Sequence, residues 1–267
     1  MICLHRFFYY LVVHQASDVM RKFNLLIVSL SLALLMVYPG CTNHNQNNMK
    51  TTTNNGDPDQ SEVSDTTTVS YLALGDSYTI GESVPQQERW PVQLASRLSG
   101  DSLLAEPVRI IARTGWTTGQ LLEGIERERI EGPYDVVSLL IGVNNQYRGL
   151  DFEIYRKQFK DLLRIAMDQA RGREDKVFVL SIPNYGVTPF ASSRDTAKIR
   201  REIDHYNEVA DSICQAYGVA FFNITPISQR AGDEPSLVAS DGLHPSGKQY
   251  RLWVDHIEDS VRTIFSE

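Results

Sequence analysis

Residues 135–141 read DVVSLLI, and after the first residue this run is almost entirely apolar. A strand with one face in water alternates apolar and polar residues, whereas a strand covered on both faces has no such alternation. We therefore predict that residues 135–141 form the central strand of a parallel sheet that helices cover on both sides.

Four other short apolar runs have the same character, and segments of helical periodicity lie between them. We expect the other strands at residues 69–74, 108–112, 177–182 and 219–222, and the helices at 91–98, 117–127, 152–170, 197–216 and 246–264. Strands that alternate with helices favour an α/β fold with helices on both faces of a parallel sheet. Residues 70–267 contain no internal linker or repeat, so we predict one domain there.

Ligands of such sheets bind at the carboxyl ends of the strands, so the residues that follow each strand are candidates for a site. Residues 75–78 (GDSY), 113–116 (RTGW) and 142–145 (GVNN) follow three of the predicted strands, and Tyr185 lies shortly after the fourth. The fifth strand leads through a long loop to residues 241–245 (DGLHP).

Ser77, Asp241 and His244 occur in a chain order that a catalytic triad can take. A serine alone is a poor nucleophile and needs an adjacent base that a third group orients. His244 is the candidate base, and Asp241 is the candidate for orienting its imidazole ring. The backbone N–H groups of Ser77 and Gly115 and the side-chain amide of Asn144 are candidate donors for an oxyanion hole.

Each of these residues also has an ordinary structural interpretation. Ser77 taken alone fits a turn or a helix N-cap, and Gly115 fits a turn with positive φ. Asn144 and Asp241 fit turns or caps equally well. The occurrence of all the blocks in one chain favours the catalytic interpretation. Residues 75–79 lack the second glycine of a GxSxG nucleophile elbow, which disfavours the α/β-hydrolase fold.

The blocks GDSY, RTGW, GVNN and DGLHP resemble those of the SGNH hydrolases, the superfamily of GDSL-type lipases and esterases. The resemblance implies a three-layer αβα, flavodoxin-like fold around a central five-stranded parallel sheet. It also implies hydrolysis of carboxylic esters through an acyl-enzyme, with no metal and no other cofactor. Tyr78 stands where the family often has Leu, and Asn145 stands where it often has Asp, so both departures concern the choice of substrate.

Tyr78, Trp116, Asn145 and Tyr185 are candidate substrate contacts because they lie in or near the loops that follow the predicted strands. Aromatic side chains there suit a sugar ring, an aryl ester or an acyl chain equally, and packing into the core is their commoner fate. For Asn145 we expect a structural role in preference to a contact with the substrate.

The N-terminal part of the chain differs in character from residues 70–267. Met20-Arg21-Lys22 precedes a mostly apolar run at residues 25–37, which is shorter than the roughly 20 residues of a membrane span. Cys41 follows soon after this run, and the arrangement resembles the signal and lipobox of bacterial lipoproteins. The resemblance implies cleavage before Cys41 and a lipid on its thiol. The alternative is an ordinary secretory signal with an incidental cysteine.

These features divide the N-terminal part into three segments. Residues 20–40 would be the signal peptide, and residues 1–19 a mis-annotated upstream extension, because Met20-Arg21-Lys22 supplies the charged start of a signal. Residues 41–69 are rich in Asn and Thr and nearly free of apolar side chains, which is typical of a disordered tether.

The formal charge of −7 disfavours a nucleic-acid partner, which would require a basic face. We expect an exported protein of the bacterial cell envelope that a lipid holds at a membrane surface, on the periplasmic or the extracellular side. Its substrate would be a small-molecule, glycan or lipid ester. Two alternatives stay open, an O-acyltransferase on the same triad and a catalytically retired binding lipoprotein, as do the acyl and alcohol specificity and the oligomeric state.

Overall fold

The computed structural model describes residues 67–99, 103–105 and 107–266. Five strands form one parallel sheet in the order β4-β2-β5-β6-β7. Their bounds are Tyr71–Gly75 for β2, Arg109–Ala112 for β4, Val136–Leu140 for β5, Val177–Leu180 for β6 and Ala220–Phe222 for β7. The predicted five-stranded parallel sheet is confirmed, and its strand order is that of flavodoxin-like folds.

Strand β5 lies at the centre of the sheet, and all of its residues are buried. Its one polar side chain, Ser138, forms a hydrogen bond of 2.8 Å with the hydroxyl of Tyr71. Parallel pairing places Ala112, Gly75 and Leu140 side by side at the ends of β4, β2 and β5. The loops after these three strands therefore begin at the same edge of the sheet.

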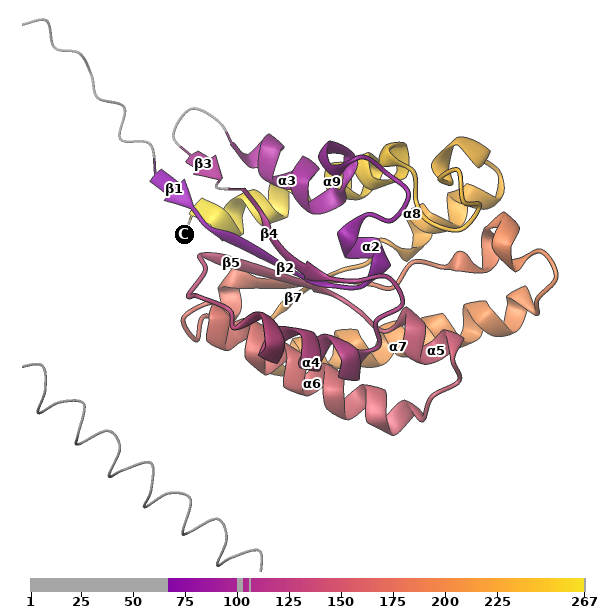
Figure 1. The fold of residues 1–267 in the computed structure, drawn as a ribbon, viewed down its shortest axis with the longest axis horizontal. Coiled ribbons are helices and arrows are strands. Elements are labelled where there is room, and N and C mark those ends of the chain that lie inside the picture. Colours follow the sequence, from indigo (N-terminus) through magenta and orange to yellow (C-terminus); the bar gives the residue numbers. More distant parts are fainter. Residues whose placement is uncertain (1–66, 100–102, 106, 267) are drawn as a thin grey trace, which may run out of the picture. The chain divides into compact units, whose positions relative to one another are not determined.

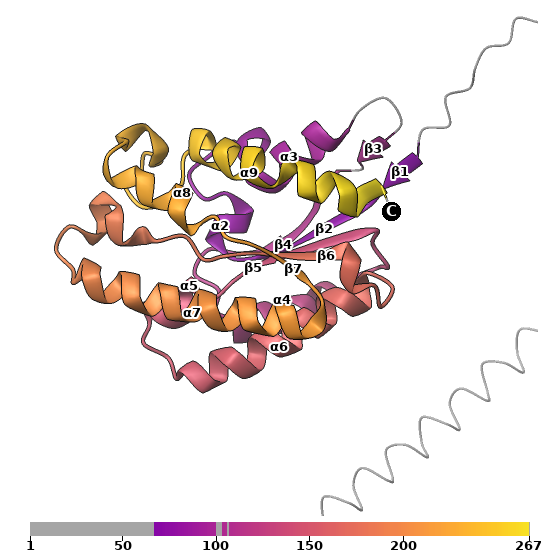
Figure 2. The ribbon, with the colours of Figure 1, turned by 180° about the vertical axis from the view of Figure 1, so that it is seen from behind.

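Helices cover both faces of the sheet, which gives the molecule three layers (Figure 1). One layer contains α2 (Ser77–Ile80), α3 (Trp90–Leu98), α8 (Thr225–Gln229) and α9 (Gly247–Ser266). The other layer contains α4 (Thr118–Glu128), α5 (Val143–Tyr147), α6 (Phe152–Gln169) and α7 (Thr196–Tyr217). Figure 2 shows the same division from behind, with α9 running beside α3. The expected αβα arrangement is confirmed.

The longer helices begin where a side chain caps the free N–H groups of the first turn. Thr117 and Gln120 form a reciprocal capping box at the start of α4. Asp151 and Asp195 each accept a hydrogen bond of 2.8 Å from a backbone N–H in the first turns of α6 and α7. These caps explain why the observed helices begin close to the predicted positions.

Several short elements were not predicted. Strands β1 (Thr67–Val69) and β3 (Leu103–Ala105) pair as a small parallel sheet of their own. Single turns of 3-10 helix lie at Gln86–Glu88, Glu174–Lys176, Tyr185–Val187, Pro189–Ala191, Arg230–Gly232 and Pro235–Leu237. Elements of one turn or less produce no periodic pattern in the sequence, because an α-helical turn itself takes 3.6 residues.

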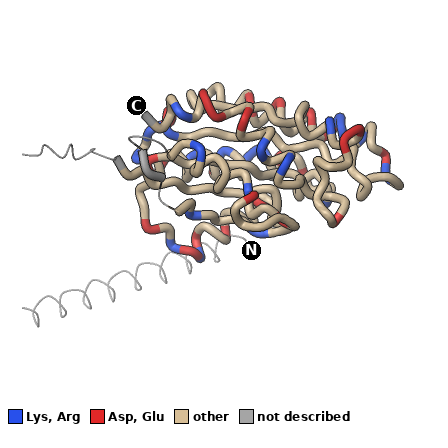
Figure 3. The backbone as a smooth tube through the Cα atoms, turned by 90° about the horizontal axis from the view of Figure 1, so that it is seen from above, with Lys and Arg blue, Asp and Glu red and all other residues tan. Residues whose placement is uncertain are grey.

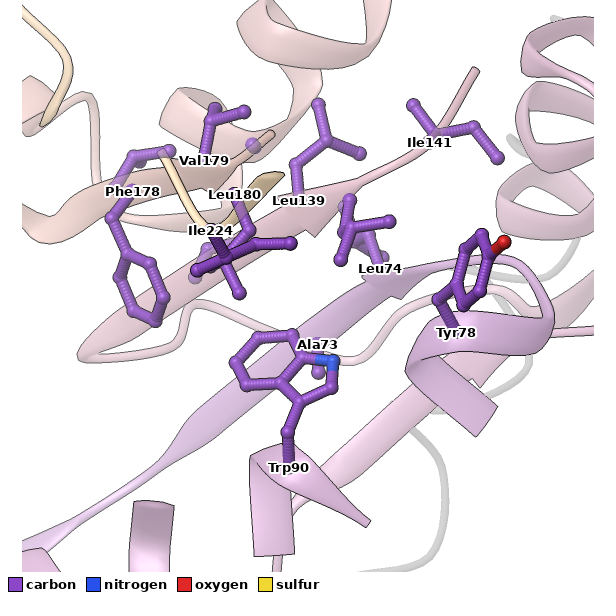
Figure 4. Packing of buried hydrophobic residues seen from close by; sticks show 14 of the residues in the cluster. Ala73, Leu74, Tyr78, Trp90, Leu139, Ile141, Phe178, Val179, Leu180 and Ile224 are labelled. Carbon is purple, nitrogen blue, oxygen red and sulfur yellow. The ribbon is translucent and has the colours of Figure 1, made fainter. Parts of the chain in front are cut away.

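The core between the sheet and the α3 layer is filled by large side chains (Figure 4). Trp90 is fully buried beside Ala73 of β2, and its ring centroid lies 6.4 Å from that of Phe178 on β6. In the opposite layer Cys214 of α7 is fully buried, and burial raises the pKa of its thiol to about 12. This thiol is therefore a small core side chain with little thiolate character.

Basic and acidic residues are interspersed along the described chain (Figure 3). None of the helices in this part of the chain is both long and apolar enough to cross a membrane. The expected upstream extension, the signal peptide, Cys41 and nearly all of the tether fall outside the described residues.

The turn from β2 to α2 contains a buried carboxyl group. Asp76 is the N-cap of α2, and its Oδ1 accepts the N–H of Tyr78 at 3.0 Å. Asp76 is 0% exposed, and its Oδ2 has no hydrogen-bond partner within the part of the chain that the structure describes. Burial raises the pKa of Asp76 to about 7, although the bond from Tyr78 opposes the shift.

Replacing Asp76 by Asn should remove a pH dependence of the stability. Between about pH 4 and pH 7 the folded chain keeps a proton on Asp76 that the unfolded chain has lost, so the free energy of unfolding falls as the pH rises through this window. Asparagine keeps the capping oxygen and does not titrate. Between these two pH values the free energy of unfolding should therefore fall by roughly 2–4 kcal/mol less in Asp76→Asn than in the wild type. Urea unfolding at several pH values measures this difference.

The exposed residue Asp233 offers a control, because Asp233→Asn should keep the wild-type slope of stability against pH. Equal slopes in the wild type and in Asp76→Asn would contradict the raised pKa of Asp76.

Candidate active site

Ser77 stands at the amino end of α2, directly behind β2. The strand ends at Gly75 and Asp76 caps the helix, so Ser77 is the first helical residue. An N–H group in this position has no partner within its own helix. Ser77 is 5% exposed, and among the described residues its hydroxyl has no hydrogen-bond partner. Contacts between a nucleophile and its base commonly tighten only when the substrate binds.

His244 and Asp241 form a tightly bonded pair in the loop before α9. His244 Nδ1 lies 2.6 Å from Asp241 Oδ2. Asp241 Oδ1 accepts the backbone N–H groups of Leu243 and His244, both at 2.9 Å, and the Ser83 hydroxyl donates to Oδ2 at 2.7 Å. The carboxylate is therefore held from its own loop and from the segment after α2.

Asp241 is ionised in this arrangement. Its partial burial alone would raise the pKa, but the hydrogen bonds from His244, Leu243 and Ser83 outweigh burial and hold the pKa of Asp241 well below its usual range. A carboxylate at Nδ1 favours the imidazole tautomer that carries its proton on Nδ1. His244 Nε2 is then left as the basic nitrogen.

Ser77 and His244 line one pocket with a volume of about 160 Å³. The loops after β2, β4, β5 and β6 and the loop before α9 supply its walls. The lining residues are Ser77, Tyr78, Thr114, Gly115, Val143, Asn144, Tyr147, Tyr185, Phe190, Leu243 and His244. Three aromatic residues form one wall: the ring centroid of Tyr147 lies 6.1 Å from that of Tyr185 and 6.0 Å from that of Phe190.

The three candidate oxyanion donors meet at this pocket. Gly115 and Asn144 line it together with Ser77. Gly115 has a φ of +82°, which favours glycine at this position of the turn. Asn144 Nδ2 donates one hydrogen to the carbonyl of Trp116 at 2.9 Å, and an amide group carries a second hydrogen.

Helix α5 and the residue after it hold the turn that contains Gly115. Arg148 Nη2 donates to the carbonyl oxygen of Gly115 at 2.5 Å. Asn145 Oδ1 accepts the N–H of Thr118 at 3.0 Å, and its Nδ2 donates to the Thr118 hydroxyl at 2.8 Å. These bonds fix the backbone of the turn relative to α5.

Two of the four candidate substrate contacts reach the pocket and two do not. Tyr78 and Tyr185 line it, whereas Trp116 and Asn145 are not among its lining residues. Asn145 is fully buried, and its amide is engaged with α4. Trp116 packs on Gly124 of α4, where an added Cβ would lie 2.3 Å from the indole ring. Both side chains turn toward α4, which no local pattern indicates.

Other lining residues were missed. Val143 and Leu243 lie within the predicted blocks, so their sequence positions were a usable signal. Phe190 lies in the loop between β6 and α7, and its N–H donates to the carbonyl of Gly242 at 3.0 Å. That contact joins segments that are distant in the sequence, so no local signal could have revealed it.

The pocket therefore combines a hydroxyl, an oriented imidazole, an ionised carboxylate and several N–H donors. Such a set can activate the hydroxyl as a nucleophile and stabilise negative charge on an acyl oxygen. Within the described residues, no group of three or more His, Cys, Asp or Glu side chains gathers as a metal-binding cluster.

The fold is similar to those of solved structures at low sequence identity. TesA has 17% identity and a TM-score of 0.59, with 74% of this chain and 99% of that chain covered. The psychrotrophic esterase EstA from Pseudoalteromonas sp. has 17% identity and a TM-score of 0.54, with 74% and 99% covered. An acetyl-xylooligosaccharide esterase from Geobacillus has 17% identity and a TM-score of 0.55, with 76% and 97% covered. At this identity the similarity shows the fold alone.

Among the curated proteins none matches this chain. The GDSL-like Lipase/Acylhydrolase family matches residues 73–252, which is more than half of the chain and includes all four predicted blocks. With the five-stranded αβα fold already established, this match shows that the chain belongs to the GDSL-like lipase/acylhydrolase family of the SGNH superfamily and is a serine hydrolase of ester bonds.

Proposed function

We propose that this protein is an exported esterase in which Ser77 is the nucleophile, His244 the general base and Asp241 the group that orients the base. One observation supports the assignment most strongly. The ionised Asp241 is hydrogen-bonded to His244 at 2.6 Å, and His244 shares its pocket with Ser77. Two other histidines of the described chain, His205 and His256, do not line this pocket.

The reaction has two halves. Ser77 Oγ forms a bond to the acyl carbon while His244 Nε2 takes the hydroxyl proton, and the N–H groups of Ser77 and Gly115 with the Asn144 amide hold the oxyanion. The bond to the alkoxy oxygen then breaks, and His244 returns the proton to the leaving alcohol. Water attacks the acyl-enzyme with the help of the same base and releases the carboxylic acid.

Replacing Ser77 by Ala should lower kcat/KM for p-nitrophenyl acetate by roughly 10³-fold or more, because the covalent route is lost. A fluorophosphonate probe should label the wild type and not the variant. Ser212→Ala is the matched control, since Ser212 is exposed on α7 and should keep full activity and labelling. Retained activity in Ser77→Ala would rule out Ser77 as the nucleophile, and an unlabelled wild type would favour a retired binding lipoprotein.

Transfer of the acyl group to a glycan hydroxyl instead of water would make the same site an O-acyltransferase. Membership of an acylhydrolase family favours water as the acceptor. The ratio of acylated glycan to free acid, measured at increasing concentrations of the glycan acceptor, distinguishes the acyltransferase from the hydrolase.

Replacing Asp241 by Asn should lower kcat by about 10³–10⁴-fold with little change in KM, because the amide no longer selects the reactive tautomer of His244. Ser83→Ala removes only one of the hydrogen bonds to Asp241 and should cost less than about tenfold. Steady-state kinetics of both variants test whether Asp241→Asn loses more activity than Ser83→Ala. A loss below tenfold in Asp241→Asn would show that Asp241 does not orient the base.

We also propose that the esterase is a lipoprotein, anchored through Cys41 at a membrane surface of the cell envelope. The support is the order of segments in the sequence: Arg21 and Lys22, the apolar run at residues 25–37, and Cys41 directly after Gly40. Residues 41–69 would act as the tether between the lipid and the hydrolase domain.

Cys41→Ser should abolish incorporation of labelled palmitate and move the protein from the membrane fraction to the soluble fraction of an expressing bacterium. Cys214→Ser is the control, because Cys214 is buried in the core and should leave the lipid label in place. A wild type that is secreted without a label would indicate an ordinary secretory signal.

A further inference from the structure

Arg194 is exposed and packs against the aromatic wall of the pocket, although it is not itself one of the lining residues. Its guanidinium carbon lies 5.0 Å from the ring centroid of Tyr147 and 4.8 Å from that of Phe190. Arg194 Nη2 also donates to the Tyr147 hydroxyl at 3.1 Å. Both rings line the pocket and are 44% and 39% exposed. The cation is thus held beside the two pocket rings that are most open to solvent.

Arg194 has no carboxylate partner within 4.0 Å among the described residues. Its neighbours along the chain differ in this respect. Lys198 lies 3.7 Å from Glu202, and Arg200 lies 3.8 Å from Asp204. The charges of Lys198 and Arg200 are therefore compensated by ion pairs, whereas the charge of Arg194 is not.

A second guanidinium without a carboxylate partner in the described chain belongs to Arg148, which donates to the carbonyl of Gly115 in the pocket wall. Three carboxylates also lie close to residues that line the pocket, and each is engaged. Glu202 accepts a hydrogen bond from the Gln146 amide and lies 3.7 Å from Lys198. Glu82 accepts a hydrogen bond from the hydroxyl of Thr114, and Asp241 is bonded to the imidazole. Arg194 and Arg148 are therefore two cations beside this pocket that have no carboxylate partner within 4.0 Å among the described residues.

We propose that the natural substrate is an ester that carries an anionic group, a carboxylate or a phosphate, and that Arg194 binds this group while Tyr147 and Phe190 contact the apolar part beside it. The proposal rests on the esterase function proposed above. A guanidinium offers a planar fork of donors that matches carboxylate and phosphate oxygens, and it can stack on aromatic rings at the same time. The charge of Arg194 would also attract an anionic ester over a short distance, although the chain as a whole carries a formal charge of −7.

Matched acetate esters test the proposal. The neutral ester is para-acetoxybenzamide, and its anionic counterparts are para-acetoxybenzoate and para-acetoxyphenyl phosphate, which separate a carboxylate from a phosphate. A second pair, p-nitrophenyl hexanoate and mono-p-nitrophenyl adipate, places the charge on the acyl side instead. For at least one pair we expect the wild type to prefer the anionic ester in kcat/KM by about tenfold at low ionic strength. The preference should shrink in about 0.5 M salt.

Arg194→Gln should reduce that preference to near unity, and Arg194→Lys should keep part of it, since the charge remains and the planar fork is lost. The quantity that decides is the ratio of the two kcat/KM values, so a general loss of activity from a disturbed aromatic wall does not affect it. Arg200→Gln is the matched control, because Arg200 is exposed on α7, paired with Asp204 and not part of the pocket. It should leave both the ratio and the rates unchanged.

A wild type that shows no preference for an anionic ester in any pair would overturn the proposal, and so would an Arg194→Gln variant that keeps the wild-type preference. The Ser77→Ala variant assayed on the same esters separates this result from the esterase function. If that variant still hydrolyses them, the assignment of the nucleophile fails, whatever the charge preference.

Discussion

The parallel pairing of β4, β2 and β5 to a common end is the constraint on which the site depends. Ala112, Gly75 and Leu140 are paired neighbours, so the three following loops leave the sheet at one edge. Strands β2 and β5 are buried throughout, and a slip of one residue would exchange the faces that their side chains occupy. The register is therefore strongly specified. It brings together a serine, a glycine and an asparagine that are far apart in the chain.

The histidine loop is positioned by different means. It follows the last strand at a distance, and sheet pairing does not determine its place. Asp241 accepts two N–H groups of its own loop, which forms the local turn, and the Ser83 hydroxyl connects it to the segment after α2. The carbonyl of Gly242 accepts the N–H of Phe190 and joins the loop to the segment after β6. Hydrogen bonds between three separate parts of the chain thus place the imidazole in the pocket that Ser77 also lines.

The walls of the pocket are less constrained than the groups that we propose for catalysis. Tyr147, Tyr185 and Phe190 come from segments after β5 and β6, which can vary without changing the sheet. The guanidinium of Arg194 belongs to the same part of the molecule. The scaffold is accordingly common to a family, and under our proposal the choice of ester depends on a few loop side chains.

From the sequence alone, the central strand at residues 135–141, the alternation of strands and helices and the blocks around Ser77, Gly115, Asn144 and His244 could all be predicted. These features are local, because periodicity and turn residues act over a few positions and the first three blocks directly follow predicted strands. Only the tertiary structure decided where individual side chains point. Asn145 and Trp116 belong to the blocks and yet turn to α4, while Phe190 reaches the pocket from a loop with no recognisable motif. Their directions depend on which distant segment packs against each loop, and such contacts leave no pattern in the residues on either side.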